Sequence, residues 1–160
     1  MLCADLTIAI SAPADRVFEA LTKGKELVRW WPNAAASDLV PGEPYRFEFR
    51  YSDGELVRTG VCISAVPAKN VALTWPDGAH SVIEFLLVPD RTPSCTLRLV
   101  HVGFGQAQAE MRAAQICADI WPGLLEKLRN YLEKGIVEQA LVGPESPGGP
   151  GGGTTETSGA

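Results

Sequence analysis

Residues 45–51 alternate strictly between aromatic and charged side chains, and this segment places the strongest constraint on the fold. A period of two puts alternate side chains of a strand on opposite faces. One face of this strand carries Tyr45, Phe47, Phe49 and Tyr51, and the other carries Arg46, Glu48 and Arg50. A sheet with one apolar face buries that face against another element. The rest of the chain must therefore supply a cover for an aromatic surface.

Five further segments have the composition of strands. One lies near the N-terminus, at residues 5–10, and four follow the aromatic strand, at residues 56–66, 71–75, 80–88 and 94–102. Turn-forming residues separate them, namely Ser52-Asp53-Gly54, Pro67, Pro76-Asp77-Gly78 and Pro89-Asp90. Short strands joined by tight turns predict an antiparallel meander.

Segments with helical periodicity are the candidates to cover the apolar face of the sheet. Residues 14–21 and 26–31 predict two short helices between the first strand and the aromatic strand, and residues 106–134 predict one long C-terminal helix. Pro122 lies inside the long pattern, which leaves a kinked helix and two abutting helices as alternatives. The predicted fold class is α+β, a curled antiparallel β-sheet gripping a long C-terminal α-helix. If the sheet curls without full contact, a cavity remains between the sheet and the helix.

Composition divides the chain into a domain and a tail. Residues 143–160 hold 7 of the 16 glycines and 3 of the 12 prolines, and their only hydrophobic residue is Ala160. The net charge is −5, and the tail contributes two of the 19 acidic residues. We expect residues 1–142 to form one domain and residues 143–160 to be disordered, because the tail has nothing to pack.

Several classes of protein are disfavoured. No stretch reaches the roughly 18 consecutive apolar residues of a membrane span. The first residues lack the basic region and small-residue cleavage site of a secretory signal. The acidic balance argues against nucleic acid, whose recognition needs clustered Lys and Arg. We therefore expect a cytoplasmic protein with neither a membrane nor a nucleic acid as partner.

The sequence has no spacing typical of a metal or cofactor site. Two histidines and four dispersed cysteines, Cys3, Cys62, Cys95 and Cys117, match no zinc pattern, and we expect reduced, buried thiols. The glycines at 103 and 105 lie between a strand and a helix, but Gln108 replaces the third glycine of a dinucleotide loop. We expect no metal and no cofactor.

Four stretches, in this order and spacing, resemble the START-like (Bet v 1-like, helix-grip) superfamily, and within it the domain of the Hsp90-ATPase-activator-homologue type. They are residues 10–21 (ISAPADRVFEAL), 27–32 (LVRWWP), 60–75 (GVCISAVPAKNVALTW) and 121–132 (WPGLLEKLRNYL). The resemblance covers about residues 4–134, and it implies a cavity between the sheet and the long helix.

The chain departs from that family at two points. Gly42-Glu43-Pro44 stands where the family commonly has a glycine pair, and Ile120 stands where it commonly has glycine. The bulkier Ile120 implies a pocket volume different from that of relatives. The superfamily includes lipid carriers, cyclases, hydrolase-like enzymes and partner-binding domains, so membership predicts the fold better than the function.

Seven residues are candidates for the lining of a ligand pocket, and the alternative for each is a place in the core. They are Trp30, Phe47, Phe49, Trp75, Phe85, His101 and Trp121. The pair Trp30-Trp31 forms either a lid over the cavity or a plug between the short helices and the sheet.

Polar candidates are few. His101 shares the face of Leu97 and Leu99, where it orients a ligand or transfers a proton, unless it only bonds to backbone where the sheet meets the helix. Glu84 is either a buried acid or a solvated residue paired with Arg98, and we favour the second. We expect His80 to be a solvated turn residue.

Three functions remain open. The first is a binding domain for a small apolar or aromatic ligand, and the second is a cyclase- or aromatase-like enzyme using the same cavity. The third is a protein-interaction domain related to Hsp90 regulators. A pocket above about 300 Å³ favours a ligand, two convergent polar groups favour an enzyme, and a large exposed apolar patch favours a protein partner. We assign no catalytic residue.

Overall fold

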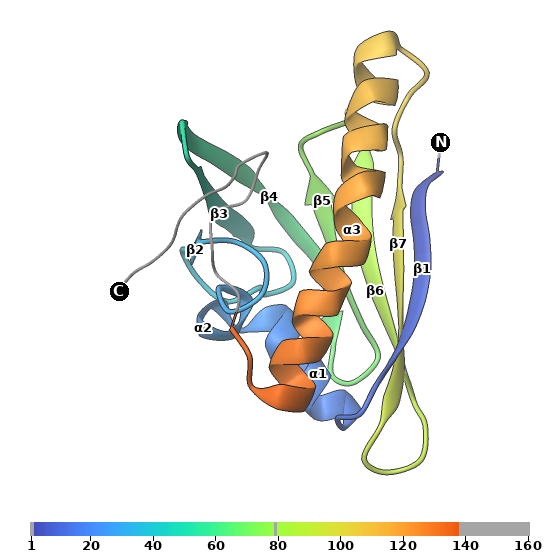
Figure 1. The fold of residues 1–160 in the computed structure, drawn as a ribbon. Coiled ribbons are helices and arrows are strands. Elements are labelled where there is room, and N and C mark those ends of the chain that lie inside the picture. The colour runs from blue at the N-terminus through green and yellow to red at the C-terminus, as the bar shows by residue number, and fades with distance from the viewer. Residues whose placement is uncertain (1, 79, 138–160) are drawn as a thin grey trace.

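The computed structural model describes residues 2–78 and 80–137 (Figure 1). Within these residues the strands form one antiparallel sheet in the order β1-β7-β6-β5-β4-β3-β2. The strands are β1 (Leu2–Ile10), β2 (Ala34–Ala35), β3 (Pro44–Tyr51), β4 (Gly54–Val66), β5 (Asn70–Trp75), β6 (Ser81–Pro89) and β7 (Cys95–Val102). The six expected strands are all present. The edge strand β2 was not expected, because two residues are too few to show a period.

The helices are α1 (Ala14–Thr22), α2 (Gly24–Leu27) and α3 (Gln108–Lys134). The second short helix starts two residues earlier than expected and ends at Leu27. Its first residue, Gly24, donates its backbone N–H to the Asp38 carboxylate at 2.8 Å, which satisfies a donor that the helix start leaves open. Helix α3 is continuous through Pro122, which is exposed, so the carbonyl that loses its partner can be hydrated.

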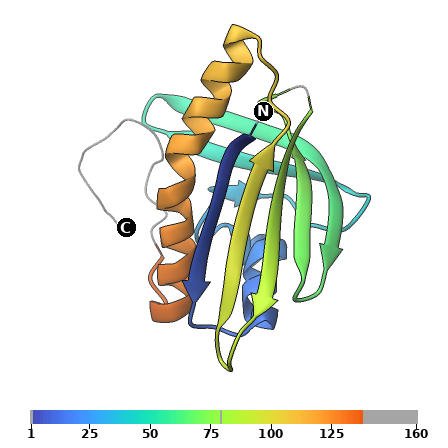
Figure 2. The same cartoon turned by 90° about the vertical axis from the view of Figure 1, so that its right-hand side faces the viewer.

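The sheet curls around α3, with α1 and α2 near the C-terminal end of that helix (Figure 1). Seen from the side, α3 runs along β1 at one edge of the sheet (Figure 2). A polar cluster joins the three helices: Arg16 bonds to Glu26 at 3.0 Å and to the Tyr131 hydroxyl at 3.1 Å, and Tyr131 donates to Glu26 at 2.5 Å. The expected α+β helix-grip class is confirmed.

Burial follows the expected alternation on β3 and β7. Tyr45, Phe47 and Phe49 are buried, as are Leu97, Leu99 and His101. Strand β4 differs from β3 and β7, because its apolar residues Val57, Val61 and Ile63 lie on the exposed face of the sheet. The cavity side of β4 instead carries Leu56 and Arg58. Helix α3 covers only one face of the sheet, and on β4 that face is not the more apolar one.

The pairing expected for Glu84 is wrong. Arg98 makes a two-pronged ion pair with Asp5 on β1, with distances of 2.9 and 2.7 Å. Glu84 accepts a hydrogen bond from Asn70 at 3.1 Å. The register explains this, because Glu84 lies opposite Val100 and Arg98 lies opposite Leu86. His80 is exposed.

No helix among the described residues is long and apolar enough to cross a membrane. The expected domain boundary at residue 142 and the tail at residues 143–160 lie outside the described residues.

Candidate functional site

A cavity of about 120 Å³ lies between helix α3 and strands β3, β4 and β5. Most of its wall is aromatic or aliphatic, and the polar exceptions are an arginine, an aspartate, a histidine, a tyrosine and a cysteine. The lining residues are Trp31, Phe49, Tyr51, Leu56, Arg58, Trp75, Asp77, His101, Ile116, Cys117, Ile120, Trp121 and Leu124.

Four of the seven candidate residues line this cavity, namely Phe49, Trp75, His101 and Trp121. The other three, Trp30, Phe47 and Phe85, are at most 1% exposed and belong to the core behind the wall. Trp31, which follows Trp30 in the turn after α2, lines the cavity in its place. Trp30 is held back by a hydrogen bond from its indole N–H to the Ala20 carbonyl at 2.9 Å. Two adjacent tryptophans in a turn have no periodicity, so the sequence does not show which of them reaches the cavity.

The aromatic wall has a layered geometry. The rings of Trp31 and Trp75 are stacked, with centroids 5.5 Å apart and planes 19° from parallel. Trp121 lies 5.4 Å from Trp31 and Phe49 meets Trp75 edge-on at 6.4 Å. Offset stacking and edge contacts are the arrangements that aromatic rings prefer.

One side of the cavity carries an ion pair that the sequence gave no reason to expect. Arg58 contacts both carboxylate oxygens of Asp77 at 2.8 Å, and the Trp75 indole N–H donates to the same carboxylate at 2.9 Å. Both side chains are less than a third exposed. Arg58 and Asp77 thus neutralise each other and hold Trp75 in position. Arg58 lies on β4 and Asp77 lies just after the end of β5, and the pairing of these two adjacent strands brings the side chains together.

His101 is wholly buried, and both of its ring nitrogens have a partner. Its Nδ1 accepts a hydrogen bond from the Trp121 indole at 3.0 Å, and its Nε2 lies 2.6 Å from the Ser81 hydroxyl. Because an indole N–H can only donate, Nδ1 carries the lone pair and Nε2 carries the proton, which it donates to Ser81. Burial lowers the pKa of His101 to about 4, so the ring is neutral near pH 7.

This arrangement differs from both sequence interpretations of His101. The ring lines the cavity, as expected of a ligand-binding residue, but it bonds to two side chains rather than to backbone. A ligand that takes a hydrogen bond from this ring, or gives one to it, must displace Trp121 or Ser81. The hydrogen bond between Trp121 and His101 therefore fixes the position of Trp121 in the wall.

Comparison with protein-family models gives one match. The model described as Activator of Hsp90 ATPase homolog 1-like protein matches residues 11–133. No curated protein shows significant similarity to the sequence.

Solved structures share the fold at low sequence identity. Protein MLL2253 from Mesorhizobium loti is 23% identical with a TM-score of 0.68, and the match covers 84% of this chain and all of that one. The Aha1 dimer from Colwellia psychrerythraea is also 23% identical, with a TM-score of 0.67 and coverage of 82% and 96%. DynU16, a protein in the dynemicin biosynthetic locus, is 19% identical, with a TM-score of 0.66 and coverage of 82% and 47%.

Proposed function

We propose that this chain, which belongs to the family of Activator of Hsp90 ATPase homolog 1-like proteins, is a binding domain for a small, flat, apolar or aromatic ligand. The ligand lies in the cavity between the sheet and α3, against the stacked rings of Trp31 and Trp75. The observation that carries this proposal is an aromatic-walled cavity in which Arg58, Asp77 and both ring nitrogens of His101 already have partners.

The size of the cavity narrows the class of ligand. At about 120 Å³ it does not reach the roughly 300 Å³ that we set above as favouring a ligand, which disfavours a drug-sized molecule. An engineered apolar cavity of roughly 150 Å³ is known to hold benzene. The ligand we propose is therefore a single aromatic ring with few substituents rather than a fatty acid or a polycyclic compound.

Thermal unfolding in the presence of single-ring aromatic compounds tests this function. A ligand at 100 times its Kd stabilises the folded chain by about 2.7 kcal/mol, so we expect Tm to rise by several degrees. Long-chain fatty acids should produce no rise. Native mass spectrometry should show one bound molecule per chain.

A pair of matched variants assigns the effect to the cavity. Ile120→Phe adds bulk to the cavity wall, whereas Ile63→Phe makes the same change on the outer face of β4, at a residue of similar exposure. We expect the first variant to abolish the stabilisation and the second to retain it. If no aromatic compound stabilises the unsubstituted chain, or if both variants respond equally, the cavity is not a ligand site.

The enzyme alternative is supported by a related fold in a biosynthetic locus, that of DynU16. It needs a free acid or base beside the ligand. Among the described lining residues, Arg58 and Asp77 bond to each other, and both nitrogens of His101 have partners. These pairings favour binding over catalysis.

The protein-partner alternative is supported by the exposed apolar residues Val57, Val61 and Ile63 on the outer face of β4. Binding of a partner there and binding of a ligand inside are compatible, since the two faces of the strand are separate. A cytoplasmic location is part of the proposal, and its support is that the four cysteines are free thiols.

A further inference from the structure

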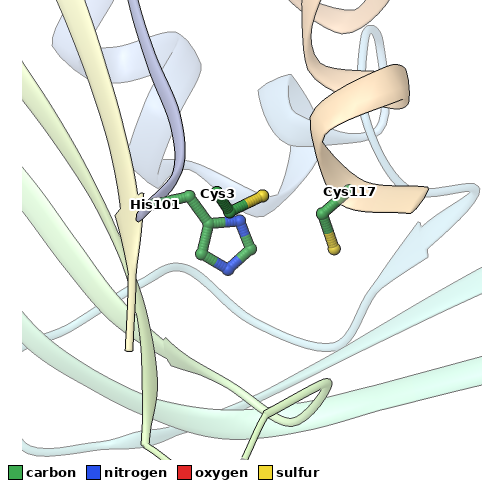
Figure 3. A group of neighbouring side chains, drawn as sticks. All are labelled: Cys3, His101 and Cys117. Atoms are coloured by element: carbon green, nitrogen blue, oxygen red, sulfur yellow. The ribbon is translucent and has the colours of Figure 1, made fainter. Parts of the chain in front are cut away.

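Three metal-ligating side chains from three separate elements meet beside the cavity (Figure 3). They are Cys3 on β1, His101 on β7 and Cys117 on α3, and their ligand atoms all lie within 4.8 Å of one another. Cysteine sulfur and histidine nitrogen are the ligands that zinc prefers in proteins. The residues are far apart in the sequence, which is why they form no recognisable spacing.

A bulge in β1 turns Cys3 toward this position. Leu2 pairs with Val102 and Ala4 pairs with His101, so Cys3 is an extra residue without a partner on β7. Bulges redirect a side chain and are frequent next to functional sites. The Cys3 thiol points at α3, where it donates to the Ala114 carbonyl at 3.1 Å. Cys117 follows Ala114 by about one helical turn, so its side chain lies on the same face of α3 that the Cys3 thiol contacts.

His101 is already in the tautomer that a metal site at Nδ1 needs. The Nδ1 edge of the ring faces Cys3 in Figure 3, and Nδ1 carries the lone pair. Nε2–H donates to Ser81 at 2.6 Å. Histidine ligands in metal sites commonly donate their second N–H in this way, which fixes the ring. An ion at Nδ1 would take the place of the hydrogen bond from Trp121.

We propose that Cys3, His101 and Cys117 bind one zinc ion, with the fourth position completed by a water or a small molecule from the cavity. His101 and Cys117 both line the cavity, so the ion would lie at its wall. With bonds of about 2.3 Å to sulfur and about 2.0 Å to nitrogen, tetrahedral ligands lie about 3.5–3.8 Å apart. The three side chains need to close by about 1 Å.

The charges balance. Each thiol releases its proton to solvent when its S–H bond is replaced by a bond to zinc, and no electron is transferred. Zn²⁺ with two thiolates and a neutral imidazole carries no net charge, which suits an apolar surrounding. The charged groups acting on Cys117 are Arg58 and Asp77, which neutralise each other. A singly charged ion would leave a negative charge buried.

The test is zinc titration of the full, reduced chain against a chromophoric chelator, with Co²⁺ as a spectroscopic probe. We expect one ion per chain, and with Co²⁺ an intense thiolate charge-transfer band together with tetrahedral visible bands. Cys3→Ser and Cys117→Ser should each lower zinc affinity by more than the roughly 10–100-fold that the loss of an outer-shell partner causes. The double variant Cys62→Ser/Cys95→Ser removes the other two free thiols and should bind as the parent does.

A further variant probes the competing hydrogen bond. Trp121→Phe removes the N–H that occupies Nδ1, so we expect zinc affinity to stay the same or to rise. The proposal is overturned if the reduced parent chain binds no zinc, if the Co²⁺ spectrum lacks the thiolate band, or if the Cys62/Cys95 variant loses affinity as Cys3→Ser does. The Co²⁺ spectrum of the parent chain decides the question even if a variant fails to fold. No organic ligand is needed, so a negative result leaves the ligand proposal standing.

Discussion

His101 is a neutral imidazole with no exposed surface, and this makes the metal-free chain sensitive to acid. Its pKa is about 4 in the folded chain, against about 6.5 in the unfolded chain. Between these values the unfolded chain binds a proton that the folded chain does not. The free energy of unfolding should therefore fall as the pH drops from 6.5 to 4, by an amount on the order of 3 kcal/mol. Urea denaturation at a series of pH values, with a chelator present, measures this slope.

Two histidine variants separate this effect from the titration of carboxylates. His101→Gln removes the buried imidazole, so its slope between pH 6.5 and 4 should be shallower, whatever its absolute stability. His80→Gln removes the other histidine, which is exposed, and should leave the slope unchanged. Equal slopes in the parent chain and His101→Gln would mean that the imidazole is protonated without loss of stability.

At the scale of the element, helix α3 contains a proline in its interior. Pro122 is exposed and lacks the N–H that would bond to residue 118. Pro122→Ala restores that bond at a position where proline is about 3 kcal/mol less favourable than alanine. Alanine also gives the unfolded chain more conformational freedom, which offsets about 0.4–1 kcal/mol, so the expected net gain in chemical denaturation is about 2 kcal/mol.

Gly123→Ala is the control for Pro122→Ala. A Cβ at residue 123 meets no atom within 4 Å, so this variant reports helix propensity alone, a gain of about 1 kcal/mol or less. A loss of stability in Pro122→Ala alone would indicate that the proline shapes α3 against the sheet.

The elements were predictable wherever one face of a strand had to be buried. Phe47 and Phe49 on β3, and Leu97 and Leu99 on β7, alternate with polar residues, and all four are buried. On β4 both faces carry apolar residues, so alternation does not identify the inner face. By sequence pattern Val57 and Leu56 are equally good candidates for the inner face, and only the position of α3 shows that Leu56 lies inside. The order of the elements followed from these patterns, and the resemblance to the family added the implied cavity between the sheet and the long helix.

At the scale of the whole molecule, the cavity wall comes from segments that no local pattern connects. Trp31, Trp75 and Trp121 come from a turn, a strand and a helix, and they meet only because the sheet curls around α3 (Figure 1). The packing of α3 against β1 brings Cys3 to Cys117, whereas Arg58 and Asp77 meet through the pairing of the adjacent strands β4 and β5. Sequence reasoning identified His101 and several aromatic residues of the wall but not Arg58 and Asp77, because nothing in the sequence pattern pairs these two charged residues.

Trp31 stacks on Trp75, contacts Trp121 and is 3% exposed, so it links the aromatic wall to the rest of the core. Trp31→Ala removes a buried indole and should destabilise the chain by about 3–5 kcal/mol. Indole added to the solution fills the space and should restore part of the lost stability, by an amount that grows with its concentration.

Leu27→Ala is the control. It also leaves a void at a wholly buried side chain, but Leu27 does not line the cavity, so indole should not restore the stability of this variant. Thermal unfolding of both variants across an indole series measures the difference. Since a domain of this size is stable by only about 5–15 kcal/mol, Trp31→Leu provides a milder version of the same void. Equal responses of the Trp31 and Leu27 variants to indole would show that the void left by Trp31→Ala is not part of the cavity.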